Sequence, residues 1–228
     1  MLAATRVDLA RSGLIDGLTT TQLANVLGFS ESSAVSRFLR EHGLTTEDWR
    51  SMRSAAAKGV SIEDVTGAIY DSESTERWSR AALTVGSFLE GALIRVWVTK
   101  PSTKEVTFDF LTPGLPSFLP SEYDEHYFES DPRIPAVLSR LGTPVSCADA
   151  VDPAEFDKSS LVNDLLDRPG IGVRWCMIQA AWLRGGLPMF FAAGRARARG
   201  PFCEPDTRRM AAAFARLKPA IAFDRAAR

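Results

Sequence analysis

Hydrophobic residues recur three and four positions apart soon after residue 60, which predicts two consecutive helices. We expect the first at Ile62–Tyr70 and the second at Thr75–Glu90. The second helix places its apolar residues on one face: Trp78, Ala82, Val85 and Leu89. This spacing is typical of helices that pack one side against a core.

Two pairs of apolar runs, each joined by a turn, predict two β-hairpins. Ala92–Val98 and Val106–Leu111 surround a turn that contains proline, and β-branched and aromatic residues dominate both runs. Val173–Leu183 and Leu187–Ala193 surround Arg184-Gly185-Gly186, whose glycines suit a tight hairpin turn.

The remaining segments add helices and one short strand. They are residues 120–141 as a helix interrupted at Asp131-Pro132, a strand at Pro144–Cys147, and helices at Pro153–Leu166 and Glu204–Phe223. We expect Pro219 to kink or end the last helix, because proline lacks the N–H that a helix interior needs. Hairpins with helices before, between and after them predict an α+β fold, an antiparallel sheet under helical cover.

Composition places the chain among ordinary globular proteins. Of its 228 residues, 45% are hydrophobic and 24% are charged, and 27 basic residues nearly balance 28 acidic ones. No apolar run is long enough for a membrane span, and the first residues lack the apolar stretch of a signal peptide. The three cysteines form no C-x-x-C pair, so we interpret them as reduced thiols in a cytoplasmic protein.

The sequence contains no familiar catalytic or metal-binding motif. Neither His42 nor His126 has the spacing of a metal ligand, and no phosphate-binding glycine loop or nucleophile elbow occurs. The acidic residues between positions 122 and 129 fit a solvated helix face better than a catalytic pair. We therefore expect no cofactor and no metal, and no particular enzymatic reaction is indicated.

The first sixty residues differ from the rest of the chain. All 13 prolines lie beyond Lys100, and small residues gather around Ala55–Ser61. We therefore expect a helical unit at residues 1–58 and a second domain at residues 61–223.

A helix-turn-helix pattern lies inside the first unit. A helix carries Leu23 and Leu27 on one face, Gly28 suits its left-handed end, and Ser30 begins a second helix at Glu31–His42. The second helix turns polar and basic residues away from its apolar stripe: Ser32, Ser33, Ser36, Arg37 and Arg40. In a helix-turn-helix such serines lie near bases, and such arginines lie near phosphates or guanine edges.

This pattern resembles the second DNA-binding element of AraC/XylS-type regulators over about Leu14–Arg53. The matching stretches are Leu23-Ala24-x-x-Leu27-Gly28-Phe29-Ser30, Ser33-Ala34-Val35-Ser36-Arg37-x-Leu39, His42-Gly43-Leu44-Thr45 and Trp49-Arg50. Val35 and Leu39 replace two phenylalanines of that family, and Thr46 replaces its proline. The family usually carries two such units, so a single one implies DNA binding as a dimer or with a partner. A helical module used for packing or dimerisation is the alternative.

A series of spaced residues runs through positions 61–222: Ile69-Tyr70-Asp71, Trp78, Tyr123, His126-Tyr127, Asp131-Pro132-Arg133, Glu155-Phe156, Ser159, Asn163-Asp164 and Arg199-Gly200-Pro201-Phe202. In this order the residues resemble the sensor domain of LuxR-type regulators, which implies a GAF/PAS-like fold with a ligand cavity under helical cover. We expect a mostly apolar pocket of roughly 300–1,000 Å³. The residues that we expect to bind its ligand are Trp97, Tyr123, Tyr127, Asp131 and Trp175. For Trp97 and Trp175 the alternative is an ordinary place in the hydrophobic core.

Three departures argue against an acyl-homoserine lactone as the ligand. Sensors of that class carry a tryptophan and a tyrosine before the Asp-Pro pair and a tryptophan after it. The matching positions here fall near Phe118, Glu122 and Cys147. Asp131 either accepts a hydrogen bond from another ligand or serves as a turn or helix-capping residue.

Together these features predict a ligand-responsive transcriptional regulator. We expect a homodimer that binds double-stranded DNA through residues 1–58 and an unidentified small molecule through residues 61–223, with Glu204–Phe223 or Thr75–Glu90 in the dimer interface. One alternative is a sensor and dimerisation module that partners another regulator without binding DNA; an enzyme is the least supported. LuxR-type regulators place the sensor first, so the order here implies either a natural rearrangement or a missing C-terminal DNA-binding domain.

Overall fold

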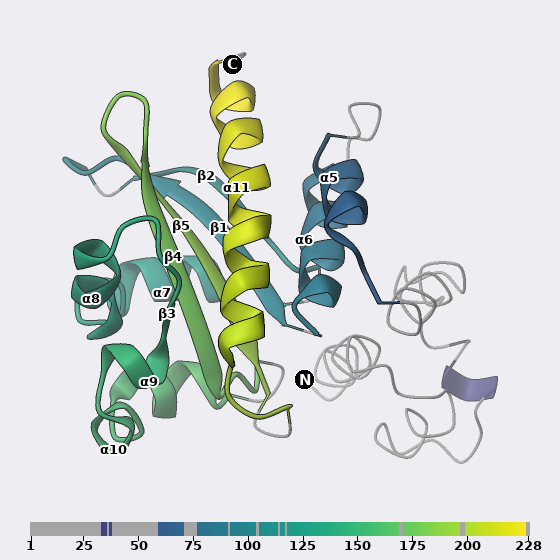
Figure 1. Cartoon of the computed structure of the whole chain (residues 1–228). Coiled ribbons are helices and arrows are strands. Elements are labelled where there is room, and N and C mark those ends of the chain that lie inside the picture. Colours follow the sequence, from purple (N-terminus) through teal and green to yellow (C-terminus); the bar gives the residue numbers. More distant parts are fainter. Residues whose placement is uncertain are drawn as a thin grey trace.

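Five antiparallel strands form one sheet in the order β2-β1-β5-β4-β3 (Figure 1). The strands are β1 at Leu93–Thr99, β2 at Val106–Leu111, β3 at Val145–Ser146, β4 at Trp175–Leu183 and β5 at Leu187–Arg195. The computed structural model describes residues 33–35, 37, 59–70, 77–90, 92–103, 105–113, 115–116, 118–168, 171–196 and 199–226. For these residues the α+β class and the antiparallel sheet are confirmed.

Both predicted hairpins, β1–β2 and β4–β5, are confirmed. Gly185 and Gly186 take φ angles of 84° and 70° in the turn between β4 and β5, a conformation that residues with a Cβ rarely adopt. The two hairpins join at the centre of the sheet, where β1 lies antiparallel to β5 and Leu93 stands opposite Gly194.

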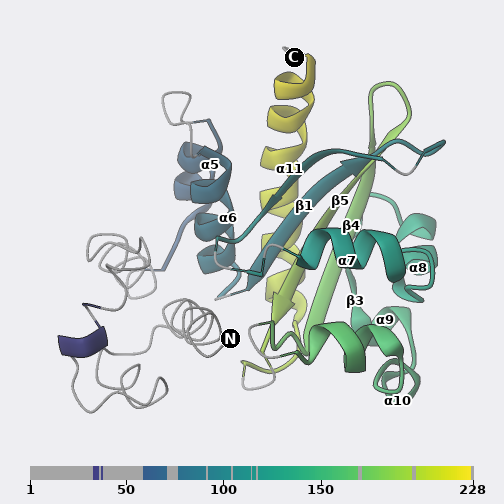
Figure 2. The same ribbon diagram turned by 180° about the vertical axis from the view of Figure 1, so that it is seen from behind.

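Each face of the sheet has its own helical layer (Figure 1 and Figure 2). Side chains alternate along β1, so Val96 points to one face, which we call the first, and Trp97 to the other, the second. The helices α5 at Ile62–Tyr70, α6 at Arg77–Phe88 and α11 at Glu204–Ala226 cover the first face. The second face is covered by α7 at Leu119–His126, α8 at Arg133–Ser139, α9 at Cys147–Ala150, α10 at Pro153–Phe156 and the π-helix η1 at Leu161–Leu166.

Apolar helix faces fill the core on the first face. Residues three or four positions apart on α11 are all buried: Met210, Ala213, Phe214, Leu217, Ala220 and Ile221. A buried ion pair fixes the start of this helix, because the Arg195 guanidinium at the end of β5 donates to Asp206 at 2.7 Å and to the Leu89 backbone oxygen at 2.7 Å. Strand β5, α11 and the end of α6 are thereby held together.

The helix predicted at Pro153–Leu166 is broken into α10 and η1. Ser159 explains the break, because its hydroxyl donates to the Phe156 backbone oxygen at 2.7 Å and accepts from the Val162 N–H at 3.3 Å. The Ser159 side chain thus ends the first helix and accepts a hydrogen bond from a backbone N–H in the first turn of the second.

Two further differences concern helix ends. The short helix α9 was not expected; the Ser146 hydroxyl caps it by accepting from the Asp149 N–H at 3.2 Å, which shortens the predicted strand. Helix α11 continues through Pro219 to Ala226. The backbone oxygen that loses its partner to proline belongs to Ala215, which is exposed, so water can bind that oxygen instead.

Candidate functional site

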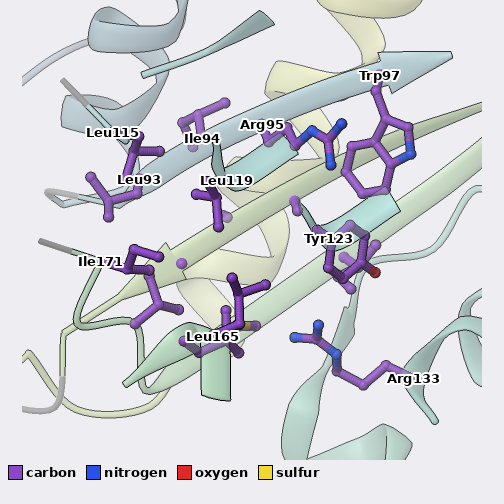
Figure 3. A pocket seen from close by; sticks show the side chains of 17 residues that line it. Leu93, Ile94, Arg95, Trp97, Leu115, Leu119, Tyr123, Arg133, Leu165 and Ile171 are labelled. Carbon is purple, nitrogen blue, oxygen red and sulfur yellow. The ribbon is translucent and has the colours of Figure 1, made fainter. Parts of the chain in front are cut away.

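A cavity of about 100 Å³ lies between the second face of the sheet and its helical cover (Figure 3). Its walls are mostly apolar and include Leu93, Leu119, Leu165, Leu166, Ile171, Val173, Ile178 and Ala192. The other side chains that shape it are Arg95, Trp97, Tyr123, Arg133 and Cys176. Our expectation of roughly 300–1,000 Å³ was therefore wrong in size. Because a cavity of about 150 Å³ can hold benzene, this one suits a molecule of about six heavy atoms or fewer.

Two carboxylates hold the Arg95 guanidinium at the cavity wall. Its Nη2 donates to Asp124 at 2.7 Å and to Asp109 at 2.8 Å, and the group lies 4.7 Å over the Trp97 ring. Burial alone would lower the pKa of Arg95, but the hydrogen bonds to Asp124 and Asp109 raise it, so the guanidinium stays charged. With two acidic partners, this cluster presents no surplus positive charge to the cavity.

Asp131 lies behind Arg133 and Tyr123 and is only 1% exposed. It accepts from Arg133 Nη2 at 2.6 Å, from Arg133 Nε at 2.8 Å and from the Tyr123 hydroxyl at 2.7 Å. The Arg133 backbone N–H adds a fourth bond at 3.0 Å, the local contact of a turn residue. Burial would raise the pKa of Asp131, but the Arg133 charge and these bonds lower it. Asp131 therefore orients two cavity residues.

Two thiols lie against the opposite side of Arg133. Cys147 Sγ is 3.6 Å from Arg133 Nη1, and Cys176 lies within hydrogen-bonding reach of the same sulfur. Hydrogen bonding from Cys176 lowers the pKa of Cys147 to about 6 in spite of burial, and the Arg133 charge adds to the effect. The same contact and burial raise the pKa of Cys176 well above its ordinary value. The two thiols titrate as a pair, so the first proton of the pair is lost more readily than that of an ordinary cysteine.

Trp97 forms a rigid part of the wall. Its ring stacks on Phe190 with centroids 5.1 Å apart and an interplanar angle of 17°. The indole Nε1 is buried and has no hydrogen-bond partner among the described residues. An unpaired buried donor is unfavourable by about 1–3 kcal/mol, so an acceptor that reached this N–H would stabilise the domain.

The structure brings two of the five predicted ligand-binding residues to the cavity. Trp97 and Tyr123 line it. Asp131 stands one contact behind, Tyr127 is buried in the core of the second face, and Trp175 begins β4; none of these three lines the cavity.

Of the residues predicted to face DNA, Ser33 and Arg37 belong to the described part of the chain. Both are helical and exposed, and Val35 between them is fully buried. Ser32, Ser36 and Arg40, and with them most of the unit predicted at residues 1–58, lie outside the described residues.

Three residues of the site were not predicted from the sequence. Arg95 had a detectable signal, because it interrupts an apolar strand at a position on the same face as Trp97. Arg133 follows the Asp-Pro pair directly and was included in that motif without a role. Cys176 carried no signal, because its contact with Cys147 depends on the pairing of β3 with β4.

Comparison with known proteins gives similarities of fold at low sequence identity. No model of a known protein family and no curated protein sequence matches the chain. One similar structure is the N-acylhomoserine-lactone-dependent LuxR-family transcription factor CepR2 from Burkholderia cenocepacia, with a TM-score of 0.47 and 17% identity over 70% of this chain and 89% of that one. The VqsR LBD domain from Pseudomonas aeruginosa has a TM-score of 0.45 and 16% identity, over 77% of this chain and 92% of that one. SdiA from Escherichia coli has a TM-score of 0.45 and 17% identity, over 77% of this chain and 66% of that one.

The described part of the chain carries two further negative observations. None of its helices combines the length and apolar character that crossing a membrane requires. Within the same residues, no three His, Cys, Asp or Glu side chains gather as metal ligands would. The polar groups at the cavity wall are guanidinium, hydroxyl, indole and thiol groups.

Proposed function

We propose that residues 61–223 sense a small neutral molecule in the cavity, as part of a ligand-responsive transcriptional regulator. The observation that carries the proposal is the cavity itself, which has apolar walls and a few convergent polar groups at one side. Protein cores are otherwise packed as densely as organic crystals. Apolar walls with a few precisely placed polar groups are typical of small-molecule sites.

The charges around the cavity define the chemistry of the ligand. Each arginine at the wall already has acidic partners, Arg95 two and Arg133 one. An anionic ligand would therefore meet carboxylates behind the guanidinium groups. A guanidinium has five N–H donors, and Arg133 uses three of them in side-chain contacts with described residues. The remaining donors suit a neutral acceptor such as a carbonyl oxygen.

Thermal unfolding of the full chain with three small probes tests this chemistry. Cyclopentanone carries a carbonyl acceptor, cyclopentane has the same ring without it, and butanoate carries a negative charge. We expect cyclopentanone to stabilise the chain most and butanoate least. At ten times its Kd a ligand stabilises by about 1.4 kcal/mol, which corresponds to roughly 3–6 °C for a domain of this size.

A cavity-filling variant locates the binding. Ala192 lines the cavity, so Ala192→Leu places three more carbon atoms inside it. The matched control Ala215→Leu makes the same change at an exposed position of α11, on the first face. The cyclopentanone shift should disappear in the first variant and persist in the second. Equal shifts in both, or no shift of the wild-type chain with any probe, would overturn the proposal.

DNA binding by residues 1–58 is the second half of the proposed function. The AraC/XylS-like pattern supports it, as does the exposure of Ser33 and Arg37 beside buried Val35. Selection from a random duplex library, followed by mobility-shift titration at several salt concentrations, is the test, because phosphate contacts weaken as salt rises. Arg37→Ala should reduce affinity by about 1–3 kcal/mol and relax discrimination, whereas Arg40→Ala should weaken all sequences alike. No salt-dependent binding would leave a sensor module that partners another regulator.

A further inference from the structure

We infer that Cys147 and Cys176 form a peroxide-sensitive dithiol that closes to a disulfide at the wall of the cavity. The last β3–β4 pair is Ser146 with Met177, so the next two positions in register are Cys147 and Cys176. Opposed residues of antiparallel strands have Cα atoms about 4.5–5.5 Å apart, within the range of about 4.4–6.8 Å that a disulfide spans. Cys147 is the first residue of α9, directly after the last paired residue of β3, and Cys176 lies within hydrogen-bonding reach of its sulfur.

The surroundings of the pair favour a reactive sulfur. Two groups lie against Cys147: the Arg133 guanidinium from α8 and the Cys176 thiol from β4. The charge of Arg174, just before β4, adds a weaker electrostatic interaction. Arginines beside a thiol stabilise its thiolate, which is the nucleophilic form. Cys176 lines the cavity, and this gives an oxidant as small as hydrogen peroxide a path to the pair.

The oxidation proceeds in two balanced steps. The Cys147 thiolate attacks one peroxide oxygen; the S–O bond forms, the O–O bond breaks, and hydroxide leaves and takes up a proton to give water. The Cys176 sulfur then attacks the sulfenic sulfur of Cys147; the S–S bond forms, the S–O bond breaks, and the departing hydroxide takes the Cys176 proton. Two sulfurs together lose two electrons, and one peroxide becomes two waters.

Cys203 provides an internal comparison. It is exposed just before α11, on the first face, and its thiol donates to Asp206 Oδ2 at 3.2 Å. Its neighbour is therefore a carboxylate, in contrast to the guanidinium beside Cys147. If exposure alone governed oxidation, Cys203 would react before the buried pair.

Peroxide treatment of the full chain, followed by tryptic digestion without reduction and mass spectrometry, tests the inference. Trypsin places the three cysteines in separate peptides: Leu141–Lys158, Trp175–Arg184 and Gly200–Arg208. We expect the first two to appear joined, lighter than their sum by two hydrogen atoms, and to separate again with dithiothreitol. Cys203→Ser should leave this link intact. Cys176→Ser should abolish it and leave a Cys147 sulfenic acid that dimedone traps.

Three results on the wild-type chain would overturn the inference. They are oxidation of Cys203 before the pair, conversion of Cys147 to sulfinic acid without a link, and a link from either buried cysteine to Cys203. None of these readouts depends on a ligand in the cavity, so the dithiol and the proposed sensing function can fail separately.

Discussion

Asp131→Asn tests whether the buried network acts as an ion pair or only as a set of hydrogen bonds. The substitution keeps the shape of the side chain and removes its charge, while Arg133 stays 5% exposed. Removing one partner of a buried pair destabilises a protein by about 3–5 kcal/mol. The Cys147 sulfur remains 3.6 Å from Arg133 Nη1 and still offers the guanidinium an acceptor. We therefore expect the lower end, about 3 kcal/mol, or a melting temperature lower by roughly 6–12 °C.

Urea unfolding at neutral pH measures this loss against a matched variant. Tyr123→Phe removes one hydrogen bond to Asp131 and leaves the charges in place, so a loss of about 1 kcal/mol is expected. A double variant, Asp131→Leu with Arg133→Met, should be more stable than Asp131→Asn, because no charge is then left without a partner. If Asp131→Asn lowered the free energy of unfolding by no more than Tyr123→Phe does, the reasoning would be refuted.

Two further predictions concern the first face and its acid stability. Gly86→Ala should destabilise the domain by roughly 2–3 kcal/mol, because the new Cβ would lie 2.5 Å from the Ala92 backbone oxygen; a urea midpoint equal to wild type would contradict this. Burial would raise the pKa of Asp206, but hydrogen bonds from Arg195 and nearby groups lower it. Asp206 therefore stabilises the fold at pH values above the ordinary pKa of aspartate, and this stabilisation is lost as the pH falls through its lowered pKa. Asp206→Asn should accordingly flatten the loss of stability below about pH 4, and an unchanged slope would count against it.

The hairpins could be predicted because their signals are local. Gly185 and Gly186 are the residues that a turn with two positive φ angles requires, and apolar runs stand on both sides. The break between α10 and η1 could not be predicted, because Ser159 is equally compatible with a continuous helix. The continuation of α11 past Pro219 likewise depends on which side of that helix faces solvent.

The residues of the site likewise fall into those that the sequence predicts and those whose contacts depend on the packing of distant segments. Trp97 was predicted as an aromatic residue of a strand and Tyr123 from the resemblance to LuxR-type sensor domains, and both line the cavity. Asp131 was expected at the ligand, yet its two oxygens are taken by neighbours whose approach depends on the packing of α7 against α8. The contact of Cys147 with Cys176 depends on strand register across about thirty intervening positions, which no local pattern encodes.

Because β1 pairs with β5, the sheet cannot assemble from local contacts alone. Each hairpin closes a short turn and forms within about 1–10 μs. Leu93 and Gly194, which stand opposite each other in the finished sheet, are separated by about a hundred positions, so their meeting carries a larger loss of chain entropy. Until that meeting, each hairpin presents an open edge on which another chain can add a strand. The β1 and β5 amides that join the two hairpins should therefore gain hydrogen-exchange protection last during refolding, although they lie at the centre of the folded sheet.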